Sequence, residues 1–431
     1  MKKPLIFLAL NEINFDLVGR YAMDLQLGNL QKVLSDGLIE TASEDSYEML
    51  EPWIQWVSVH TGMAATDHGV FRLGDIVNAG GLKQIFEVVE ERGFKVGAVS
   101  PMNAENKLRN PDYFVADAWT QTSSGPGTFF QALAAAIAQA VGDNATGKIS
   151  PSSLFIVLMS LIRYANPSNY LRYIQFALSS RKAPWRKALF LDLFLSDLHL
   201  KLMKKCKTDF SWLFLNAGAH IQHHYYFNAA AADGQIENPR WYVKPDVDPV
   251  AEMLKVYDHI LAAHFARHAE IIVATGLTQK PYDRVKYYYR LKDHAHFLAS
   301  AGIEFEVVEP RMTRDFLVRF HSQEAARIAE VALKKIEVLG AKKPLFGEVD
   351  NRGASLFVTL NYPDAINDDD EIALPAGKFK IKPMVAFVAI KNGMHDGKGY
   401  AYFSPGVAGL APQDNQHVKG LYNVIDEYFA V

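Results

Sequence analysis

The sequence predicts an α/β fold with a mostly parallel central sheet and helices on both of its faces. Short apolar segments with the character of buried strands alternate along the chain with amphipathic segments of helical periodicity. The chain is also large enough for a substantial core, since it has 431 residues of which 49% are hydrophobic. In sheets of this kind the functional residues follow the carboxyl ends of the strands.

Each predicted strand is a short apolar run that ends at polar or turn-forming residues. These runs cover residues 5–10, 95–99, 212–215, 270–274, 305–308, 356–360 and 385–390. Residues 82–93 and 249–268 repeat apolar side chains at three- and four-residue spacing, which predicts helices between the strands. The polar segments that follow strands at residues 11–12, 216–224 and 274–279 are therefore the first places to look for a site.

A short buried helix is predicted directly after Glu51. Pro52 suits the first position of a helix, where no backbone N–H is needed, and Gly62 suits the C-terminal end. Trp56 and His60 share one face at helical spacing, which predicts burial. We therefore interpret His60 as a core histidine.

The length suits either one large α/β domain with insertions or two domains, and we expect a single domain over residues 1–431. No internal repeat or low-complexity linker is found. Residues 150–207 are predicted to form a helical insertion or cap within it. Arg163 interrupts the apolar run of this insertion well before the roughly 18 residues that a membrane span needs. No membrane span is therefore expected.

The apolar stripes of the helical insertion need a partner surface. One interpretation is that its helices pack on one another and on the rest of the domain as a cap. The alternatives are a membrane-surface face and a face for homo-oligomer formation. Packing as a cap is favoured, because lysine and arginine flank the polar side of these helices without dominating it.

The composition argues against several classes of protein. A formal net charge of −3 provides no basic surface for nucleic acid, so no nucleic-acid partner is expected. The single cysteine, Cys206, excludes an internal disulfide framework and suits a reducing compartment. The N-terminal segment MKKPLIFLALNEINFD is similar to a signal peptide, but its short apolar run reaches Asn11 and Glu12 without a small-residue cleavage site. A cytoplasmic location is therefore predicted.

No nucleotide cofactor is expected. The segment GDNATGKI, residues 142–149, has the glycine and lysine spacing of a phosphate loop but lacks the Ser or Thr that would hold magnesium. It also follows an alanine-rich helical run, whereas a phosphate loop follows a strand. We interpret it as a helix end and a loop.

The order of several segments resembles that of the alkaline phosphatase superfamily, specifically its type I phosphodiesterase and nucleotide pyrophosphatase branch. The segments are LIFLALNEINFDLV, IQWVSVHTGMAATDHGV, IFEVVEERGFKVGAVS, DYFVADAWT, FLNAGAHIQHHYYF, IIVATGLTQ and NGMHDGKGYAYFSPG. The resemblance covers most of the chain and implies an alkaline-phosphatase-like α/β fold. It also implies a site of two divalent metals, usually zinc, held by three Asp and three His beside a Thr or Ser nucleophile at a helix N-terminus.

Carried over position by position, the resemblance implies that most of the metal ligands are absent. The first Asp corresponds to Asn11 and the second Asp to Ala219. The Asp-His pair corresponds to Ala274 and Thr275, so one metal loses two ligands at once.

The remaining positions imply a reduced site. The nucleophile falls at Glu51 or Pro52, neither of which has a hydroxyl group. His223 and His395 keep ligands of the family type, and both belong to the same metal. We therefore expect at most one divalent metal, with zinc as the first candidate, and no covalent intermediate.

Neighbouring residues can replace part of the lost chemistry. Glu12 lies beside the lost Asp and Glu51 at the predicted helix start, and these two are the catalytic candidates. His220, His223 and His395 could form a three-histidine metal site with an open position for water. The alternative for His220 is that it packs beside neighbouring aromatic residues.

A second group of residues is predicted to bind a small anionic or sugar-like ligand. Arginine forks bind phosphate or carboxylate groups through paired hydrogen bonds, and Arg311 and Arg314 follow a predicted strand. Gln279 and Asn11 follow other strands and complete the predicted set. The alternative for each arginine is an exposed or salt-bridged side chain.

Three hypotheses on function follow from these patterns. The favoured one is an enzyme, a hydrolase or transferase that acts on a phosphate or sulfate ester with at most one metal. The second is a catalytically inactive protein that binds an anionic ligand in the same place. The third is an interaction protein whose helical segment at residues 150–207 is the working surface.

Overall fold

The chain folds into two compact units in the computed structural model, which describes residues 2–142, 149–232, 234, 236–311 and 314–430. The first unit contains the described residues of the ranges 2–141, 149–281 and 393–430, and the second contains those of the range 282–392 together with Gly142. The sequence predicts a single domain over residues 1–431, whereas the described residues form two large hydrophobic cores, one in each unit, and a small third cluster of Val57, Val70 and Ile76. A single core rarely serves more than roughly 250–300 residues, which accounts for the division. Residues 143–148 of the GDNATGKI segment lie outside the described residues, so its interpretation stays a prediction.

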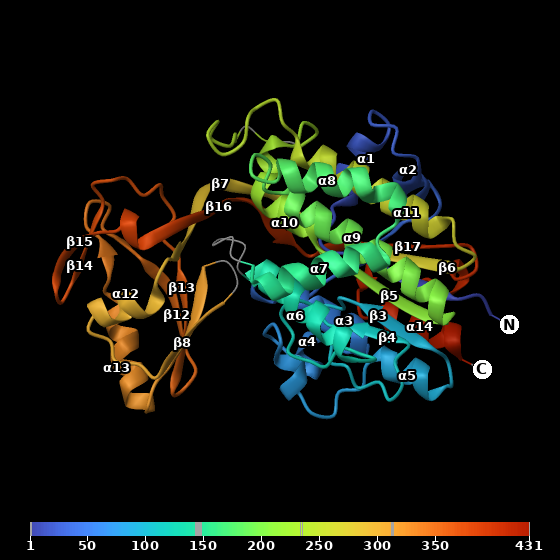
Figure 1. The fold of residues 1–431 in the computed structure, drawn as a ribbon, viewed down its shortest axis with the longest axis horizontal. Coiled ribbons are helices and arrows are strands. Elements are labelled where there is room, and N and C mark those ends of the chain that lie inside the picture. The colour runs from blue at the N-terminus through green and yellow to red at the C-terminus, as the bar shows by residue number, and fades with distance from the viewer. Residues whose placement is uncertain (1, 143–148, 233, 235, 312–313, 431) are drawn as a thin grey trace. The chain divides into compact units, whose positions relative to one another are not determined.

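The first unit is built around an eight-stranded sheet (Figure 1). In spatial order its strands are β18 (Gln416–His417), β2 (Ile39–Ala42), β17 (Lys398–Phe403), β6 (Glu270–Ala274), β1 (Leu5–Leu10), β5 (Phe210–Leu215), β3 (Val96–Val99) and β4 (Tyr113–Val115). The strands from β6 to β4 are parallel, while β17 runs antiparallel to both of its neighbours. The predicted α/β class with a mostly parallel sheet is confirmed.

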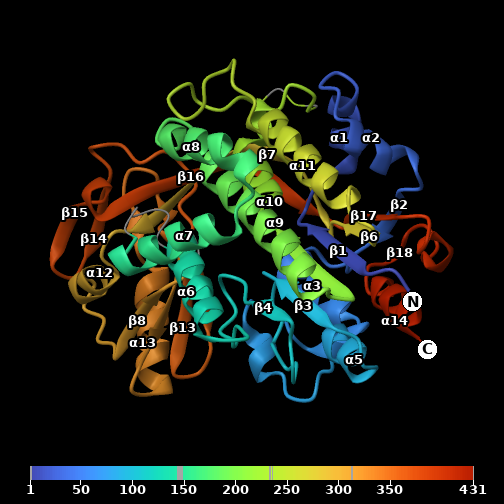
Figure 2. The same ribbon diagram turned by 45° about the vertical axis from the view of Figure 1, so that its right-hand side comes forward.

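Helices cover both faces of this sheet, as Figure 1 and Figure 2 show. One face carries α1 (Phe15–Ala22), α2 (Gly28–Ser35), α9 (Arg186–Cys206), α10 (Ala217–Tyr225) and α11 (Pro249–Phe265), and the other carries α3 (Pro52–Thr61), α5 (Ile85–Glu91) and α14 (Gly420–Phe429). The core is centred on β1, all of whose residues are buried. Phe7 of β1 stacks on Trp212 of β5 with ring centroids 4.0 Å apart, and Trp56 of α3 packs edge-on against both rings.

Helix α3 begins and ends where the sequence predicts, and the short helix α4 (Ala65–His68) follows it. Pro52 is the first residue of α3, and Gly62 ends it in a left-handed conformation with φ 72°. Any side chain at Gly62 would be strained there and would approach the ring of Tyr422 to 2.9 Å. His60 is completely buried and its ring packs against that of Trp212.

The segment predicted as a helical insertion is helical, but its three helices differ in role. α9 packs against β3 and β5, so it belongs to the helical layer that covers the sheet. α7 (Pro151–Tyr164) and α8 (Tyr170–Ser179) pack on α9 and form an additional outer layer, which α6 (Thr128–Gly142) precedes. Within the described residues, no helix has both the length and the apolar character that crossing a membrane requires.

The second unit combines small antiparallel sheets with two helices. Its elements are β8 (Val307–Pro310), β9 (Asp315–Arg319), β12 (Phe346–Asn351) and β13 (Ser355–Leu360) in one sheet, β10 (Glu337–Val338), β11 (Lys343–Pro344), β14 (Glu371–Leu374) and β15 (Gly377–Lys380) in another, and α12 (His294–Ser300) and α13 (Gln323–Lys334). β7 (Thr278–Leu291) and β16 (Val385–Asp396) pair with each other and carry the chain from one unit to the other and back. The strands predicted at residues 305–308 and 356–360 belong to this unit and not to the central sheet. The sequence suggested the central sheet because α12 and α13 alternate with strands here, as helices do in a parallel sheet.

The buried His60 should make the stability of the first unit depend on pH. Burial lowers the pKa of His60 from 6.5 to about 3, and neither ring nitrogen has a hydrogen-bond partner among the described residues. Above the unfolded-state pKa of 6.5, His60 is neutral in both states and the folded state keeps its full stability. As the pH falls from 6.5 toward about 3, only the unfolded chain takes up the proton, so the free energy of unfolding decreases. Between about pH 7 and about pH 5, His60 alone should lower the free energy of unfolding by about 2 kcal/mol.

Urea unfolding followed by tryptophan fluorescence tests this prediction, since all six tryptophans lie in the first unit. Between about pH 7 and about pH 5, the free energy of unfolding should fall by about 2 kcal/mol less in His60→Phe than in the parent protein. His268→Phe, at an exposed position, should leave it unchanged. The same pH dependence in the parent protein and in His60→Phe would contradict the prediction.

Candidate metal centre

Three side chains from separate parts of the first unit meet at the carboxyl edge of its parallel strands. β1 is followed by Asn11 and Glu12, and Glu12 N donates to Thr275 O at the end of β6 at 3.0 Å. β5 runs into α10, which carries His223. β17 is antiparallel to β6, so the segment that leads into β17 brings His395 to the same edge. The topology thus gathers residues that are far apart in the sequence.

The backbone of Glu12 adopts a conformation that non-glycine residues rarely occupy. Its φ is 60°, in the left-handed region. The N–H bond to Thr275 O and a bond of 2.7 Å from Gln222 Nε2 to Glu12 O hold it there. The side chain is buried, with 2% of the residue exposed. Strained residues that the surrounding structure fixes in this way cluster at functional sites.

Glu12, His223 and His395 form a compact triangle of potential metal ligands, which we call the ligand triangle. Glu12 Oε2 lies 3.0 Å from His223 Nε2 and 3.3 Å from His395 Nε2. The two Nε2 atoms are 3.3 Å apart. Zinc binds nitrogen and oxygen ligands at about 2.0–2.1 Å, so two ligands of a tetrahedral zinc are about 3.3–3.4 Å apart. The triangle therefore has nearly the dimensions of one face of that tetrahedron.

Hydrogen bonding alone accounts poorly for the ligand triangle. If both imidazoles donate to Glu12 Oε2, each Nε2 carries a hydrogen, and the two hydrogens then face each other across 3.3 Å. Glu12 Oε2 also accepts a hydrogen bond of 2.5 Å from Gln279 Nε2. A cation between the three atoms removes the conflict, because each imidazole then presents a lone pair. Two histidines and one glutamate are a ligand set of catalytic zinc sites, which keep a further position open, and also of non-haem iron sites.

A metal ligand requires the ionised form of the Glu12 carboxyl group. Burial raises its pKa, but the charges of His395 and His223 when these are protonated, and hydrogen bonds from both rings, lower it well below the usual range. A bound cation would take the place of those ring charges. One carboxylate and two neutral imidazoles would leave a bound divalent cation with one net positive charge. Such a site would attract an anion.

Asn11 supports Glu12, and both hydrogens of its side-chain amide are already used. Its Nδ2 donates to Glu12 Oε1 at 3.0 Å and to Asn216 Oδ1 at 2.8 Å. Its Oδ1 accepts a bond of 2.8 Å from Trp56 Nε1. The sequence predicted that Asn11 binds ligand, whereas its burial and these three bonds give it a positioning role.

Gln279 has a similar supporting role in place of the predicted ligand contact. It is completely buried, and besides Glu12 its Nε2 bonds to Ala219 O at 3.0 Å. Gly393 allows β16 to pass close by, because a Cβ atom there would lie 2.0 Å from Gln279 Oε1 and 2.8 Å from Gln222 O. The absence of a side chain at Gly393 is therefore a requirement of the site.

Glu51 approaches the ligand triangle from the N-terminus of α3. Its Oε2 lies 3.6 Å from His395 Nδ1, the ring nitrogen that does not face the triangle. This is an ion-pair distance, longer than a hydrogen bond. A carboxylate that moves within hydrogen-bond distance of the outer nitrogen would orient a metal-binding imidazole and increase its basicity. The side chain of Glu51 is 33% exposed, so it is also accessible to water. Its predicted catalytic role stays a prediction.

His220 is not part of the ligand triangle, although the sequence predicted it as a metal ligand. Its ring packs against those of His224 and Tyr225, with centroid distances of 4.9 Å and 6.4 Å. Burial, and secondarily the charge of His223, lowers its pKa to about 4. The predicted three-histidine site is therefore corrected to two histidines and Glu12, and His220 packs beside aromatic residues as the alternative proposed.

Arg311 and Arg314 belong to the second unit and have partners there. Arg311 Nη2 lies 2.6 Å from Glu309 Oε2. Arg314 donates to Asn361 Oδ1 at 2.6 Å and lies over the ring of Tyr288 at 4.2 Å from its centroid. Their binding of an anionic ligand stays a prediction for the second unit.

Sequence reasoning missed three supporting residues of the site. Asn216 and Gln222 fall within the strand-end segment at residues 216–224, but position after a strand does not tell which polar side chains turn inward. Gly393 carries no signal in the sequence beyond its place two residues before His395. Only the packing of β16 on the site explains it.

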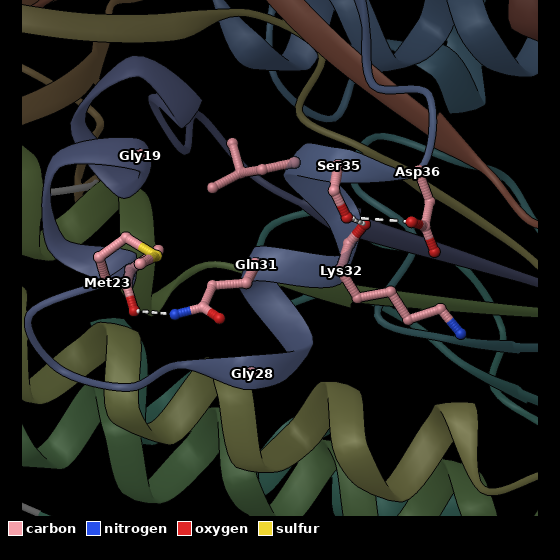
Figure 3. Close-up of a pocket in the computed structure, with 9 residues that line it drawn as sticks. Gly19, Met23, Gly28, Gln31, Lys32, Ser35 and Asp36 are labelled. Atoms are coloured by element: carbon pink, nitrogen blue, oxygen red, sulfur yellow. Dashed lines mark hydrogen bonds between the residues drawn. The ribbon is translucent and has the colours of Figure 1, made fainter.

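A surface depression elsewhere in the first unit offers no comparable chemistry. It lies beside α1 and α2 and is drawn in Figure 3. Its polar groups serve local structure, since Gln31 Nε2 donates to Ala22 O at 2.7 Å and Ser35 Oγ to Asp36 Oδ1 at 2.9 Å. We therefore assign no site to this depression.

No protein-family model and no curated protein matches this sequence. Solved structures are similar to it over nearly the whole chain. Phosphonoacetate hydrolase from Sinorhizobium meliloti 1021 in complex with phosphonoformate has 13% identity and a TM-score of 0.43, with 100% of this chain and 96% of that chain covered. Murine ectonucleotide pyrophosphatase/phosphodiesterase 5 has 10% identity and a TM-score of 0.41, with 99% and 95% covered.

Alkaline phosphatase from the Antarctic bacterium TAB5 has 10% identity and a TM-score of 0.39, with 99% of each chain covered. These three proteins are members of the alkaline phosphatase superfamily, which the order of segments in this sequence resembles. The chemistry assigned to the site rests on the residues described above.

The ligand triangle should bind one zinc ion per chain, and His223→Ala should abolish that binding while the protein stays folded. Loss of a direct ligand should lower the affinity by more than the roughly 10- to 100-fold that follows loss of a supporting residue. Elemental analysis and zinc titration measure the effect. His220→Ala is the matched control, because it removes a histidine of the same helix that lies outside the triangle. Two tightly bound metals per chain, or equal losses in both variants, would refute the assignment.

Glu51 should contribute to metal affinity through His395. Glu51→Gln keeps the size of the side chain but removes its charge, and we expect it to weaken zinc binding about 10-fold. Glu48→Gln is the control, because Glu48 is exposed and bonds to Ser46. Equal zinc affinity in Glu51→Gln and the parent protein would show that Glu51 does not act through the histidine.

Proposed function

We propose that this chain is a hydrolase or transferase of phosphate or sulfate esters, or of a related anionic, sugar-like ligand, that uses one divalent metal with zinc as the first candidate. The observation that carries the proposal is the ligand triangle, whose edges measure 3.0, 3.3 and 3.3 Å. The side chains of His223 and His395 are 29% and 13% exposed, so a small ligand can reach them. Glu12 is buried, so a ligand would reach the triangle from the two more exposed histidines.

A divalent metal in the triangle would polarise an ester oxygen and neutralise the negative charge that develops on it. The protein contributes a preorganised set of donors. Asn11 and Gln279 each bond to one oxygen of Glu12, so its carboxylate is oriented before a ligand arrives. Preorganised groups of this kind stabilise charge without the cost of reorganisation during the reaction.

The start of α3 supplies the second element of the proposed mechanism. Glu51, the residue before the helix, makes no side-chain capping bond, so the positive end of the helix dipole has no side-chain cap. Neither Glu51 nor Pro52 has a hydroxyl group, which argues against a covalent intermediate at this position. The attacking group is therefore water or an acceptor hydroxyl. The partly exposed carboxylate of Glu51 is the candidate to accept its proton.

A catalytically inactive ligand-binding protein is the second candidate. The specific observation in its favour is the same lack of a hydroxyl group at the start of α3. In this case the ligand triangle and α3 would hold an anionic ligand without turning it over. Measurement of turnover separates the two candidates.

The test is a panel of a phosphomonoester, a phosphodiester and a sulfate ester, assayed with chelator-treated protein before and after addition of zinc. We expect zinc-dependent turnover of at least one substrate, its loss in His223→Ala, and parent-level turnover in His220→Ala. Glu51→Gln should lower kcat by about 100-fold or more if Glu51 accepts a proton. Zinc binding without turnover of any ester would support the inactive protein and overturn the enzymatic proposal.

A further inference from the structure

Helices α7 and α8 expose an unusual number of large apolar side chains. On α7 these are Leu154, Phe155, Leu158, Met159 and Ile162, and on α8 they are Tyr170, Leu171, Ile174 and Leu178. On each helix they recur at intervals of one and four residues, so they form one stripe along the helix. Leu171 and Leu178 are 80% and 81% exposed. We call these nine residues the apolar face.

The packing of the two helices explains why this face points away from the first unit. α7 and α8 pack on α9, which in turn packs on β3 and β5 of the sheet. Their inner sides are already filled by buried residues such as Tyr164, Tyr173 and Phe176. Exposed apolar surface of this extent is uncommon in monomeric proteins and marks an interaction site.

The charge of this segment is equally distinctive. Between residues 149 and 191 the sequence has six basic residues and no acidic residue, although acidic residues outnumber basic ones 48 to 45 in the whole chain. Arg163 lies in the last turn of α7, Arg172 lies on α8, and Arg181 and Lys182 follow α8 directly. Arg163, Arg181 and Lys182 are exposed. The helices that carry the apolar face, and the turn after α8, thus have basic residues and no acidic ones. Arg186, further along, pairs with Glu252 of α11.

We propose that the apolar face binds an anionic lipid surface, with α7 and α8 lying in the plane of the interface. Helices that bind in this way combine an apolar side, which enters the boundary between headgroups and acyl chains, with lysine and arginine that contact anionic headgroups. Insertion across the bilayer is excluded for these helices by their length, since α7 spans 14 residues and α8 spans 10.

A second copy of this chain fits the same face less well. In a twofold dimer the same surface occurs on both partners, so Arg163, Arg181 and Lys182 of one copy would face the cations of the other. With no acidic residue in this segment, nothing within it offsets the repulsion. In an anionic bilayer, the apolar side chains contact acyl chains while the cations contact anionic headgroups. The proposal is independent of the metal centre and of the proposed reaction.

Sedimentation with lipid vesicles tests the proposal on the full chain. We expect binding to vesicles of phosphatidylcholine mixed with phosphatidylglycerol, and much weaker binding to phosphatidylcholine alone. Raising the salt concentration from about 0.1 M to about 1 M shortens the Debye length from about 10 Å to about 3 Å and should weaken the binding. Equal binding to both kinds of vesicle would overturn the proposed role of charge.

Paired variants assign the binding to the apolar face. Leu171→Asp with Leu178→Asp should lower the affinity at least about 100-fold, since each leucine removed from an apolar environment changes it by about 10-fold or more. Both positions are exposed, so the fold should be unaffected. Met23→Asp with Trp241→Asp is the matched control, because it changes two exposed apolar residues elsewhere in the first unit by the same charge.

The basic residues are tested separately from the apolar ones. Each change of Arg163, Arg181 or Lys182 to Gln should lower affinity for the anionic vesicles about fivefold, the contribution of one cation near an anionic leaflet. Analytical ultracentrifugation measures the oligomeric state and so tests the competing explanation, a dimer. A dimeric parent protein that becomes monomeric in Leu171→Asp with Leu178→Asp, and that does not bind vesicles, would show that the partner is a second copy and would overturn the proposal.

Discussion

The candidate site depends on the backbone of a single residue at the end of the central strand. In the ordinary extended conformation, Glu12 would continue β1, and its side chain would not meet the histidines. The left-handed turn at Glu12 redirects the carboxylate toward His223 and His395. Such a conformation costs about 1–3 kcal/mol, so it persists only where other contacts fix it. Bonds to Thr275 and Gln222 supply that constraint, which makes the strand end and the metal site one structural feature.

The sequence predicts the elements that depend on local pattern more reliably than the partners of individual side chains. The start of α3 at Pro52, its end at Gly62 and the buried strands β1 and β6 all follow from local rules of capping and hydrophobicity. The pairing of His223 and His395 was predicted through the resemblance to a family. Glu12 was named from the sequence as a neighbour of the lost Asp. Its place beside both histidines could not be predicted, because it depends on a positive φ that no sequence pattern specifies for glutamate.

The division into two units was missed for a related reason. Periodicity reports whether a segment is a strand or a helix, but it does not report which sheet a strand joins. The apolar runs predicted at residues 305–308 and 356–360 follow helical segments, as the strands of the parallel sheet do, although β8 itself is VVEP and largely exposed. Their antiparallel pairing is set by contacts within the second unit. Similarly, the sequence shows that residues 150–207 are apolar and helical, but only the exposed fractions show that one side of α7 and α8 has no partner within the first unit.

The boundaries between the two units have a mechanical consequence for the metal centre. They fall inside β7, after Pro281, and inside β16, before Gly393. Gln279 lies two residues from the first boundary and His395 two residues from the second. In each case only two residues of strand join a residue of the candidate centre to the boundary of the second unit, so the connection has almost no slack.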